Sequence, residues 1–595
     1  MKKLLLLVFL SGFSYAQYSI RSPYLLDPEK AIGYVDSCAR FWNKAYDTTL
    51  GGFYTNIDRY GNLISSWGTN KNTLSEARDA YGYVRAFMMT GNETYLSYAR
   101  NALDFMYHHA WDNTNTGWFT NLDKYGNPVN SKENKDAFNQ HYALLGITAC
   151  FEATADTLDL NWLMKGYRNN EQKLWDKRGD YEGYYDNVTF NWATKSGKSF
   201  NATVDAITTH VLYLYLLTGD AQYKDKLLRI TDNILKYLVG SMDHQKTGFV
   251  EEFDSDWNQD DSQTMTIMGH VLKTAWCLGR VYQISPDTAY ISAAQKLIKS
   301  VLDKGYDHEL GGPYKDFNRT TGQMLMWGAD TAKAWWQMEQ AVTAGLELYD
   351  ITKDVEYLRM ADESLDFFMK YFVDHQYGEV YSDRTRYGKR VPQWGEEKGN
   401  SGKAAYHSTE LGYYVYLYGN LFLRKEPVSL YYYFKADPGE REIPLYPLAI
   451  GDGRLKIKSV ALNGEPYSNF TSAGRRLRIP SGVGGKFKVT FELNDISSVS
   501  KEEITRPETF SLSQNYPNPF NPVTRIRYSV DAEASHVSLK VYDVLGNLAA
   551  ILVSEVKNPG QYEVSFDAKA LSSGIYFCRL QSGSNTKTIK MTLLK

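Results

Sequence analysis

Two kinds of helical pattern alternate along the first 425 residues of the chain. The first kind is amphipathic, with Leu, Ile or Phe at helical spacing on one side and charged residues on the other, as in 93–109, 221–239 and 355–372. The second kind is apolar on nearly every side, which is typical of a helix buried between neighbours. Its six occurrences cover residues 75–90, 136–154, 204–218, 266–284, 331–351 and 405–421.

Turns with one repeated composition separate these helices. The same pattern occurs six times: Asp, then a few polar residues, then Gly. Successive Asp residues of this pattern lie 64 to 67 positions apart. Asp and Gly are typical of tight turns, and the alternation after each Gly indicates short strands. Six units with one exposed and one buried helix each predict an all-α (α/α)6 toroid over residues 17–425. The six turn residues are Asp47, Asp112, Asp176, Asp243, Asp307 and Asp374.

Beyond residue 425 the pattern becomes alternating, which is typical of strands. Segments 428–434, 455–462, 476–479 and 487–493 predict a small β-sandwich, an accessory domain over 426–497. A polar linker, 498–511, leads to a second β module at 512–595. The predicted fold class is therefore multidomain, an (α/α)6 toroid followed by two small all-β, immunoglobulin-like sandwiches.

The N-terminus has the composition of a signal peptide. Lys2 and Lys3 precede an apolar run, 4–13, which is too short to span a bilayer. Ser14, Tyr15 and Ala16 then form the small-x-small pattern that signal peptidase recognises, so we expect residues 1–16 to be removed. No later segment has about eighteen consecutive apolar residues, so the chain is expected to be exported without a transmembrane anchor.

Charge and composition narrow the function classes. The net charge of −3 and the absence of a basic block argue against nucleic acid as a partner. The four cysteines are scattered and lack the spacing of a zinc site, and the three that lie in helical patterns are expected to be small buried residues. The chain has 47 Tyr and 13 Trp. Exposed aromatic rings stack on sugars, which suggests a carbohydrate ligand, although most of these rings are expected to fill the helical core.

Distinctive polar or aromatic residues lie near the start of each inner helix. Their separations are about one repeat, so the ring geometry is expected to bring them to one mouth of the toroid. Four of the ten histidines belong to this set, which predicts a functional pocket there. The set comprises Arg78, His141, His210, His270, Trp335 with Trp336, and His407.

Imidazole suggests the chemistry of this pocket. It titrates near neutrality, so two histidines can act as base and conjugate acid at working pH. Two imidazoles facing each other across a sugar carbon could remove a proton from one face and return it to the other, as epimerisation beside a carbonyl requires. The histidines come from different helices and no His-x-x-x-His pair occurs, so no metal is expected.

The toroid resembles the N-acylglucosamine 2-epimerase and cellobiose 2-epimerase superfamily over about residues 25–425. The order and spacing of six segments carry this resemblance: Glu76-Ala77-Arg78, Thr208-Thr209-His210, 251–257, Gly269-His270, 333–336 and Tyr406-His407.

The resemblance implies a role for several residues. His270 and His407 would be the acid/base pair, acting through an enediolate at C2 of a reducing-end saccharide and without a cofactor. Arg78 would bind sugar oxygens near the carbonyl, and His210 would assist ring opening or polarise the carbonyl. The same family includes aldose–ketose isomerases, which return the proton to C1. The substrate-binding residues would be Trp335, Trp336, His141, Glu339, Lys273 and Tyr213.

Three positions depart from the family pattern. Tyr213, Lys273 and Gln340 stand where the family usually has Glu, although Glu339 is adjacent to the last of them. The missing carboxylates predict that the imidazoles lack partners that would orient them and raise their basicity. Lys273 would also add positive charge that favours an acidic substrate.

Three other functions stay open on the sequence alone. (α/α)6 toroids also host glycoside hydrolases and polysaccharide lyases. Hydrolysis needs two carboxyl groups beside the scissile bond, and Glu251, Glu252 and Glu396 are among the candidates. A lyase could use His407 as base, with Arg78 neutralising a uronate. A non-catalytic carbohydrate-binding toroid would also explain the lost carboxylates.

The last 84 residues resemble type IX secretion C-terminal sorting domains. The run that begins Leu512-Ser513-Gln514-Asn515 and continues to Pro522 carries the resemblance, together with 541–546, 573–577 and 588–591. The resemblance implies that the type IX machinery is a partner. It also implies a protein that crosses the inner membrane by its signal peptide and the outer membrane by type IX secretion, and so acts at the cell surface or outside.

Overall fold

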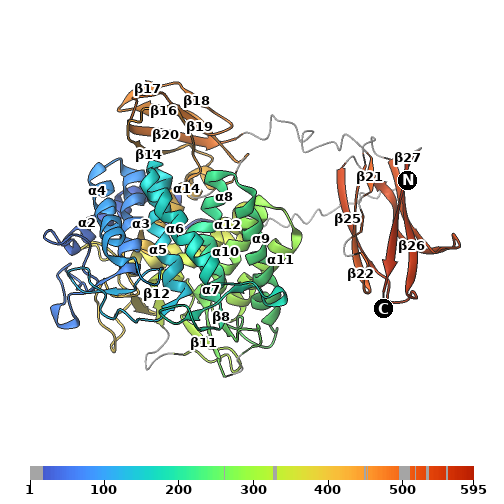
Figure 1. Ribbon diagram of the computed structural model, residues 1–595, viewed down its shortest axis with the longest axis horizontal. Helices are drawn as coiled ribbons and strands as arrows, with labels where there is room; N and C mark the ends of the chain where they lie inside the picture. The colour runs from blue at the N-terminus through green and yellow to red at the C-terminus, as the bar shows by residue number, and fades with distance from the viewer. Residues whose placement is uncertain are drawn as a thin grey trace, which may run out of the picture. The chain divides into compact units, whose positions relative to one another are not determined.

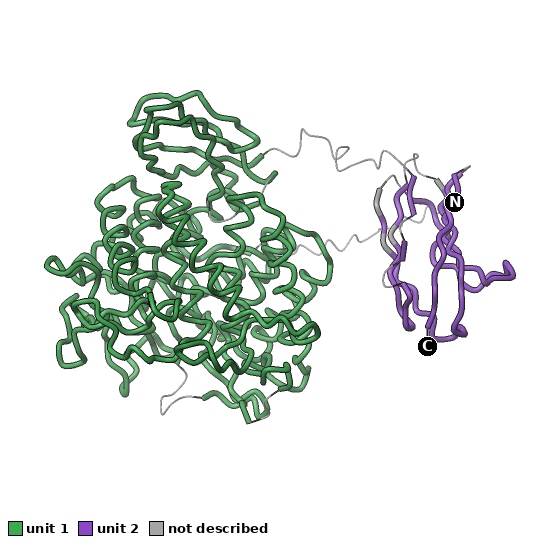
Figure 2. The backbone as a smooth tube through the Cα atoms, viewed as in Figure 1, with its two compact units in different colours: residues 1–494 green, residues 495–595 purple. Residues whose placement is uncertain are grey.

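The computed structural model describes residues 18–259, 262–325, 332–447, 450–451, 453–494, 510–512, 514–515, 518–530, 535–557, 560–583 and 585–594. The predicted signal peptide lies outside these residues. The chain forms two compact units, residues 1–494 and 495–595 (Figure 2). The toroid and the accessory β-domain that the sequence divides at residue 425 belong to the same unit.

An inner ring of six helical segments surrounds the axis of the first unit, counted over its described residues. Neighbouring segments contact each other in sequence order and the last contacts the first, so the ring is closed. The segments are α3 (Thr73–Thr90), α5 (Ala137–Thr154), α7 with α8 (Phe200–Ala206 and Leu212–Thr218), α10 (Met268–Ile284), α12 (Trp335–Thr352) and α14 (Tyr406–Tyr418).

An outer ring of amphipathic helices covers the inner one. Their apolar faces pack inward, as Tyr357, Leu365 and Phe368 do in α13, while their charged faces meet solvent. The predicted (α/α)6 toroid is thus confirmed as a helical toroid. The outer helices are α2 (Lys30–Trp42), α4 (Glu93–Phe105), α6 (Thr157–Lys173), α9 (Ala221–Asn233), α11 (Thr288–Lys304) and α13 (Val355–Tyr371).

Two inner helices begin away from their predicted starts. Helix α7 begins at Phe200, four residues earlier than expected, because the Ser199 side chain accepts a hydrogen bond from the Ala202 N–H and caps it. Helix α12 begins at Trp335, four residues later, because β12 (Ala332–Ala334) pairs with β13 (Asp383–Thr385) instead of continuing the helix.

A buried lysine fixes the start of most inner helices. In four units it lies two residues before the helix, and its ammonium contacts the turn Asp of the same unit at 2.9 to 3.1 Å. The Asp in turn accepts backbone N–H groups of its own turn, as Asp47 does from Thr49 and Leu50. The pairs are Lys71–Asp47, Lys135–Asp112, Lys198–Asp176 and Lys333–Asp307, and Lys398–Asp374 at 2.9 Å occupies the sixth turn.

The fourth unit differs from the others. Thr266 stands two residues before α10, where four other units have lysine, and its side chain lies against Gly248 of the turn. The start of α10 is held instead by Glu251, whose Oε1 accepts the Ile267 N–H at 2.8 Å. A carboxylate therefore replaces the ammonium at this helix start.

The accessory domain consists of two antiparallel sheets, in the orders β14-β20-β16-β17 and β15-β19-β18. Strand β14 packs against α3 and α5. Figure 1 shows the sheets at the end of the toroid opposite β8 (Lys198–Ser199), β11 (Asp316–Asn318) and β12. The four predicted strands are found. The bounds are β14 (Val428–Phe434), β15 (Arg441–Pro444), β16 (Leu455–Leu462), β17 (Glu465–Tyr467), β18 (Phe470–Thr471), β19 (Arg476–Ile479) and β20 (Gly485–Leu493).

Over its described residues, the second unit also has two sheets, β21-β22-β25 and β24-β23-β26-β27. Alternate residues of its strands, such as Val537, Leu539 and Val541, form a separate apolar core. The β-rich character is as predicted, and the immunoglobulin-like assignment stays a prediction. The bounds are β21 (Ser511–Leu512), β22 (Val523–Val530), β23 (Ser535–Tyr542), β24 (Leu548–Lys557), β25 (Gly560–Asp567), β26 (Gly574–Ser582) and β27 (Asn585–Leu593).

Two smaller expectations can be checked on this structure. Cys38, Cys150, Cys277 and Cys578 are all free and buried, as predicted for the three cysteines that lie in helical patterns. Among the described residues, no helix has both the length and the apolar character needed to cross a membrane.

Replacing Lys71 by Met removes the ammonium and leaves Asp47 buried without its partner. The free energy of unfolding is expected to fall by about 3–5 kcal/mol, because an uncompensated buried charge is costly. All 13 Trp residues precede residue 395, so tryptophan fluorescence during urea unfolding reports on the toroid.

Lys299→Met is the control for this variant. Its ion pair with Asp303 is solvent-exposed, with side-chain exposures of 74% and 51%, so its loss should change the stability by less than about 1 kcal/mol. Equal effects of the two substitutions would contradict the role of the buried pair.

Candidate active site

A pocket of about 330 Å³ opens where the inner helices begin. Its volume is at the low end of the range for small-molecule sites. All six inner helical segments contribute to it, mostly through their first two turns. The lining residues are Arg78, Phe138, Tyr142, Phe200, Asn201, Asp205, His270, Lys273, Trp335, Trp336, Gly402 and His407.

His270 is held from two sides. Its Nδ1 lies 2.8 Å from Oε2 of Glu251, and its ring stacks on Phe200 with centroids 3.8 Å apart. Because Glu251 also accepts the Ile267 N–H, the carboxylate is anchored to the start of the same helix that carries the histidine. The contact fixes the orientation of the ring.

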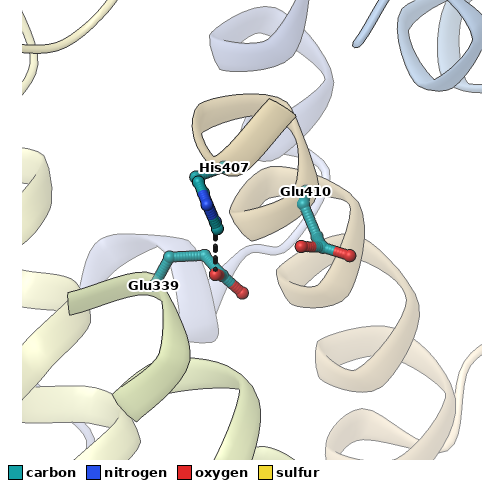
Figure 3. Close-up of side chains that lie close together, drawn as sticks. All are labelled: Glu339, His407 and Glu410. Carbon is teal, nitrogen blue, oxygen red and sulfur yellow. Dashed lines mark hydrogen bonds and ion pairs between the residues drawn. The ribbon is translucent and has the colours of Figure 1, made fainter. Parts of the chain in front are cut away.

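His407 is held by a second carboxyl group. Its Nδ1 lies 3.2 Å from Oε2 of Glu339, a residue of α12 (Figure 3). Burial lowers the pKa of His407 well below its ordinary value, and the nearby charge of Arg78 lowers it further. Burial also raises the pKa of Glu339 well above its ordinary value, and the carboxyl group of Glu410 raises it further. Both shifts favour uncharged groups in this part of the site.

Glu339, His407 and Glu410 form the cluster that Figure 3 shows. Their potential ligand atoms all lie within 4.8 Å of one another, a spacing that could hold a metal ion. However, the Thr343 hydroxyl donates to Oε1 of Glu339 at 2.6 Å, and the Gln340 amide donates to Oε2. Because both oxygens of Glu339 already accept protein donors, we interpret the cluster as a buried hydrogen-bonding network behind His407.

Two tryptophans lie close to both histidines. The Trp336 ring is 5.3 Å from His270 and 6.1 Å from His407, measured between centroids, and Trp335 is 6.1 Å from His407. Both indoles line the pocket. They provide flat apolar surface next to the imidazoles, which suits the apolar face of a sugar ring.

Arg78 is a positively charged residue of the pocket. It has no carboxylate partner among the described residues. Its guanidinium donates to the Gly402 carbonyl and lies over the Tyr142 ring, 4.6 Å from the centroid. A cation placed in this way can bind an oxygen on which negative charge develops.

His141 and His210 do not line the pocket, which corrects the expected position of both. They are fully buried and stack on each other, with centroids 5.3 Å apart. Burial lowers the pKa of His141 to about 3 and that of His210 well below its ordinary value. The cause is helical phase, because His141 adjoins Tyr142 and so points about 100° away from it.

Tyr213 and Glu339 are likewise absent from the lining. The Tyr213 hydroxyl accepts from the buried Arg85 deeper in the toroid, and Glu339 lies behind His407. The expectation that the imidazoles lack carboxylate partners is also wrong. Glu251 and Glu339 reach Nδ1 of His270 and His407 from sequence positions other than the three that departed from the family pattern.

Sequence reasoning missed several residues of the pocket, among them Phe138, Tyr142, Asn201 and Asp205. They form two pairs spaced four residues apart, each on one face of an inner helix. That spacing near a helix start is a signal that could have identified them. The motif residue His210 follows Asp205 by five residues, across the π-helical turn η5 (Ile207–Val211), and so faces elsewhere.

Two parts of the chain match known protein families. Residues 52–410 match the N-acylglucosamine 2-epimerase (GlcNAc 2-epimerase) family. Residues 514–594 match the secretion system C-terminal sorting domain. A cellobiose 2-epimerase of Bacteroides fragilis is 22% identical over 355 residues, which are 57% of this chain and 86% of the relative.

Solved structures share the toroid. The cellobiose 2-epimerase from Spirochaeta thermophila DSM 6192 superposes with a TM-score of 0.58 at 22% identity, covering 67% of this chain and 98% of that one. A D-mannose isomerase gives a TM-score of 0.59 at 18% identity, covering 66% and 99%. The family match spans more than half of the chain and all the residues that line the pocket. The chain therefore belongs to the N-acylglucosamine 2-epimerase family of carbohydrate epimerases, and it ends in a type IX secretion sorting domain.

Proposed function

We propose that this protein is a secreted epimerase that inverts C2 of a saccharide with a free reducing end. The single observation that carries the proposal is the pair of pocket histidines, His270 and His407, each with Nδ1 directed at its own carboxyl group. Family membership supports the reaction class, and the sorting domain supports action at the cell surface or outside.

The two histidines differ in their partners, and this difference suits two-sided proton transfer. Glu251 accepts a backbone N–H, so we assign an Nδ1–H to His270 that donates to the carboxylate and leaves Nε2 with a lone pair. Glu339 has a strongly raised pKa, so we assign it a proton that it donates to Nδ1 of His407. The hydrogen of the neutral imidazole is then on Nε2. One imidazole is then a base and the other an acid.

The proposed reaction begins with the open-chain aldose. Nε2 of His270 takes the C2 proton, the C–H electrons form a C1–C2 double bond, and negative charge moves to O1 of the enediolate. Arg78 stabilises that oxygen. Nε2–H of His407 then delivers a proton to the opposite face of C2, the carbonyl re-forms, and Nδ1 accepts the proton held by Glu339. The reverse reaction exchanges the two roles. Between turnovers in the same direction, His270 releases its extra proton to water, and a proton from water restores the Nε2–H of His407 while its Nδ1 proton returns to Glu339.

The pocket walls support a sugar substrate. Trp335 and Trp336 offer stacking surface, and Phe200 holds the base in position. An exported epimerase would meet oligosaccharides and released polymer fragments, so we favour a free saccharide as substrate.

Replacing His270 or His407 by Ala should lower the rate of C2 exchange by about 10²–10⁴-fold, the usual contribution of a general acid or base. The measurement is incorporation of deuterium at C2 in D2O, followed by NMR for glucose-, mannose- and cellobiose-type substrates.

His244→Ala is the control, because that side chain is 88% exposed and is not among the pocket residues. Unchanged exchange in both pocket variants would contradict the assignment. Deuterium at C1 would indicate an isomerase, shortened oligosaccharides a hydrolase, and an ultraviolet-absorbing unsaturated product a lyase.

Glu251→Gln keeps an acceptor for the Ile267 N–H but removes the charge that stabilises the protonated form of His270. We expect kcat to fall by about 10–100-fold while KM changes by less than about threefold. The neighbouring Glu252, which is exposed, provides the matched control Glu252→Gln with expected wild-type kinetics. A fall in kcat of the same size in both variants would refute the positioning role of Glu251.

A further inference from the structure

An acidic side chain with an unused oxygen lines the pocket. Asp205, on α7, is 1% exposed, and its Oδ1 accepts from the Lys273 ammonium at 2.6 Å. Its Oδ2 is buried and has no hydrogen-bond partner among the described residues. An unpaired oxygen of a buried carboxylate is costly, so it is rarely retained without a donor that completes it.

Lys273 holds this carboxylate in place. Its ammonium, 3% exposed, also donates to the Tyr142 hydroxyl at 3.0 Å. Burial by itself lowers the pKa of Lys273, but the charge of Asp205 more than reverses this and the pKa lies well above its ordinary value. The pair comes from two different inner helices and is fixed by two short contacts.

The charge of Lys273 is therefore not available to an acidic ligand. It is compensated by Asp205 at contact distance, in contrast to the expectation that this lysine favours an acidic substrate. Arg78 lies across the ring of Tyr142 and is the cation of the pocket left for an anionic oxygen. The pocket wall formed by Asp205 and Lys273 therefore presents a hydrogen-bond acceptor to a ligand, and not a positive charge.

We propose that Asp205, held by Lys273, binds a hydroxyl group of the substrate through Oδ2 and selects neutral saccharides over uronates. A sugar hydroxyl supplies the donor that the buried oxygen lacks, whereas a uronate carboxylate has no donor at that position and would be repelled. Asn201 lies one helical turn before Asp205 and lines the pocket beside it, which adds a second polar group to this wall. The inference rests on the proposed function in one respect, namely that the pocket receives a saccharide.

The test uses the full chain and a set of cellobiose analogues that each lack one hydroxyl group. For wild type, removal of one particular hydroxyl should lower kcat/KM by about 10–100-fold, the range for a hydrogen bond to a charged group. Asp205→Ala should lose a similar factor on cellobiose itself and should no longer distinguish cellobiose from that analogue. Asp205→Asn, which keeps the side-chain shape, should give an intermediate loss.

Glu152→Gln is the matched control. It removes the charge of another buried ion pair, with Arg85 at 2.7 Å, whose residues are not among those lining the pocket. This variant should keep the wild-type discrimination among the analogues, even if its stability falls as much as that of the Asp205 variants. The proposal is overturned if Asp205→Ala reduces kcat/KM by one common factor for every analogue, or if Glu152→Gln changes the discrimination in the same way.

Binding calorimetry separates this inference from the proposed reaction. Cellobiitol has no carbonyl group and cannot epimerise, so its affinity reports on the pocket alone. Weaker binding by Asp205→Ala supports the hydroxyl contact even if C2 exchange fails in every saccharide. Unchanged binding, or no binding by wild type, overturns the contact even if C2 exchange is found.

A charged probe tests the selectivity. Wild type should bind glucose more tightly than glucuronate, and Asp205→Ala should narrow this difference because Lys273 is then uncompensated. Tighter binding of glucuronate than of glucose by wild type would overturn the proposed preference.

Discussion

A lysine ammonium buried beside a turn aspartate determines where most of the inner helices begin. Removing two charges from water costs several kcal/mol per ion, and only close contact with well-placed additional hydrogen bonds offsets that cost. Lys198, for example, contacts Asp176 at 3.1 Å and also donates to the Gly183 carbonyl at 3.0 Å. The turn and the helix start therefore cannot shift independently. The pocket is lined mainly by the first turns of these helices. A shift of one residue in the start of a helix would therefore rotate the lining side chains of that helix by about 100°.

The fourth unit shows how this constraint was adapted to chemistry. It lacks the lysine, and Glu251 holds the start of α10 through the Ile267 N–H while its second oxygen contacts His270. One carboxylate thus fixes both the backbone and the imidazole that it orients. In the other units, the corresponding place near the helix start is filled by an ion pair that makes no contact with a pocket histidine.

The charge state of each titratable group in the pocket depends on how far it is buried and on whether it has an oppositely charged partner. His407, Glu339 and Glu410 are so buried that their neutral forms are favoured, whereas Lys273 remains charged because Asp205 is in contact with it. Burial and pairing therefore distinguish an uncharged cluster around His407 from a fixed, charge-compensated wall at Asp205 and Lys273. Arg78, which has no carboxylate partner among the described residues, is the cation that the proposed reaction uses to stabilise the charge on O1.

The sequence by itself determined the architecture, because period and turn chemistry are local properties. The Asp–Gly turns, the alternation of amphipathic and apolar helices and the C-terminal strands all follow from short-range patterns, and so do the family and the sorting domain. His270, His407, Arg78, Trp335 and Trp336 were also placed in the pocket correctly, since each lies near a helix start. What only the tertiary structure decided is which neighbours reach them. His141 and His210 point away because of helical phase, Asp205 lines the wall in place of His210, and the carboxyl partners of the imidazoles come from Glu251 and Glu339. Such contacts join segments up to 68 residues apart, and a linear pattern does not specify them.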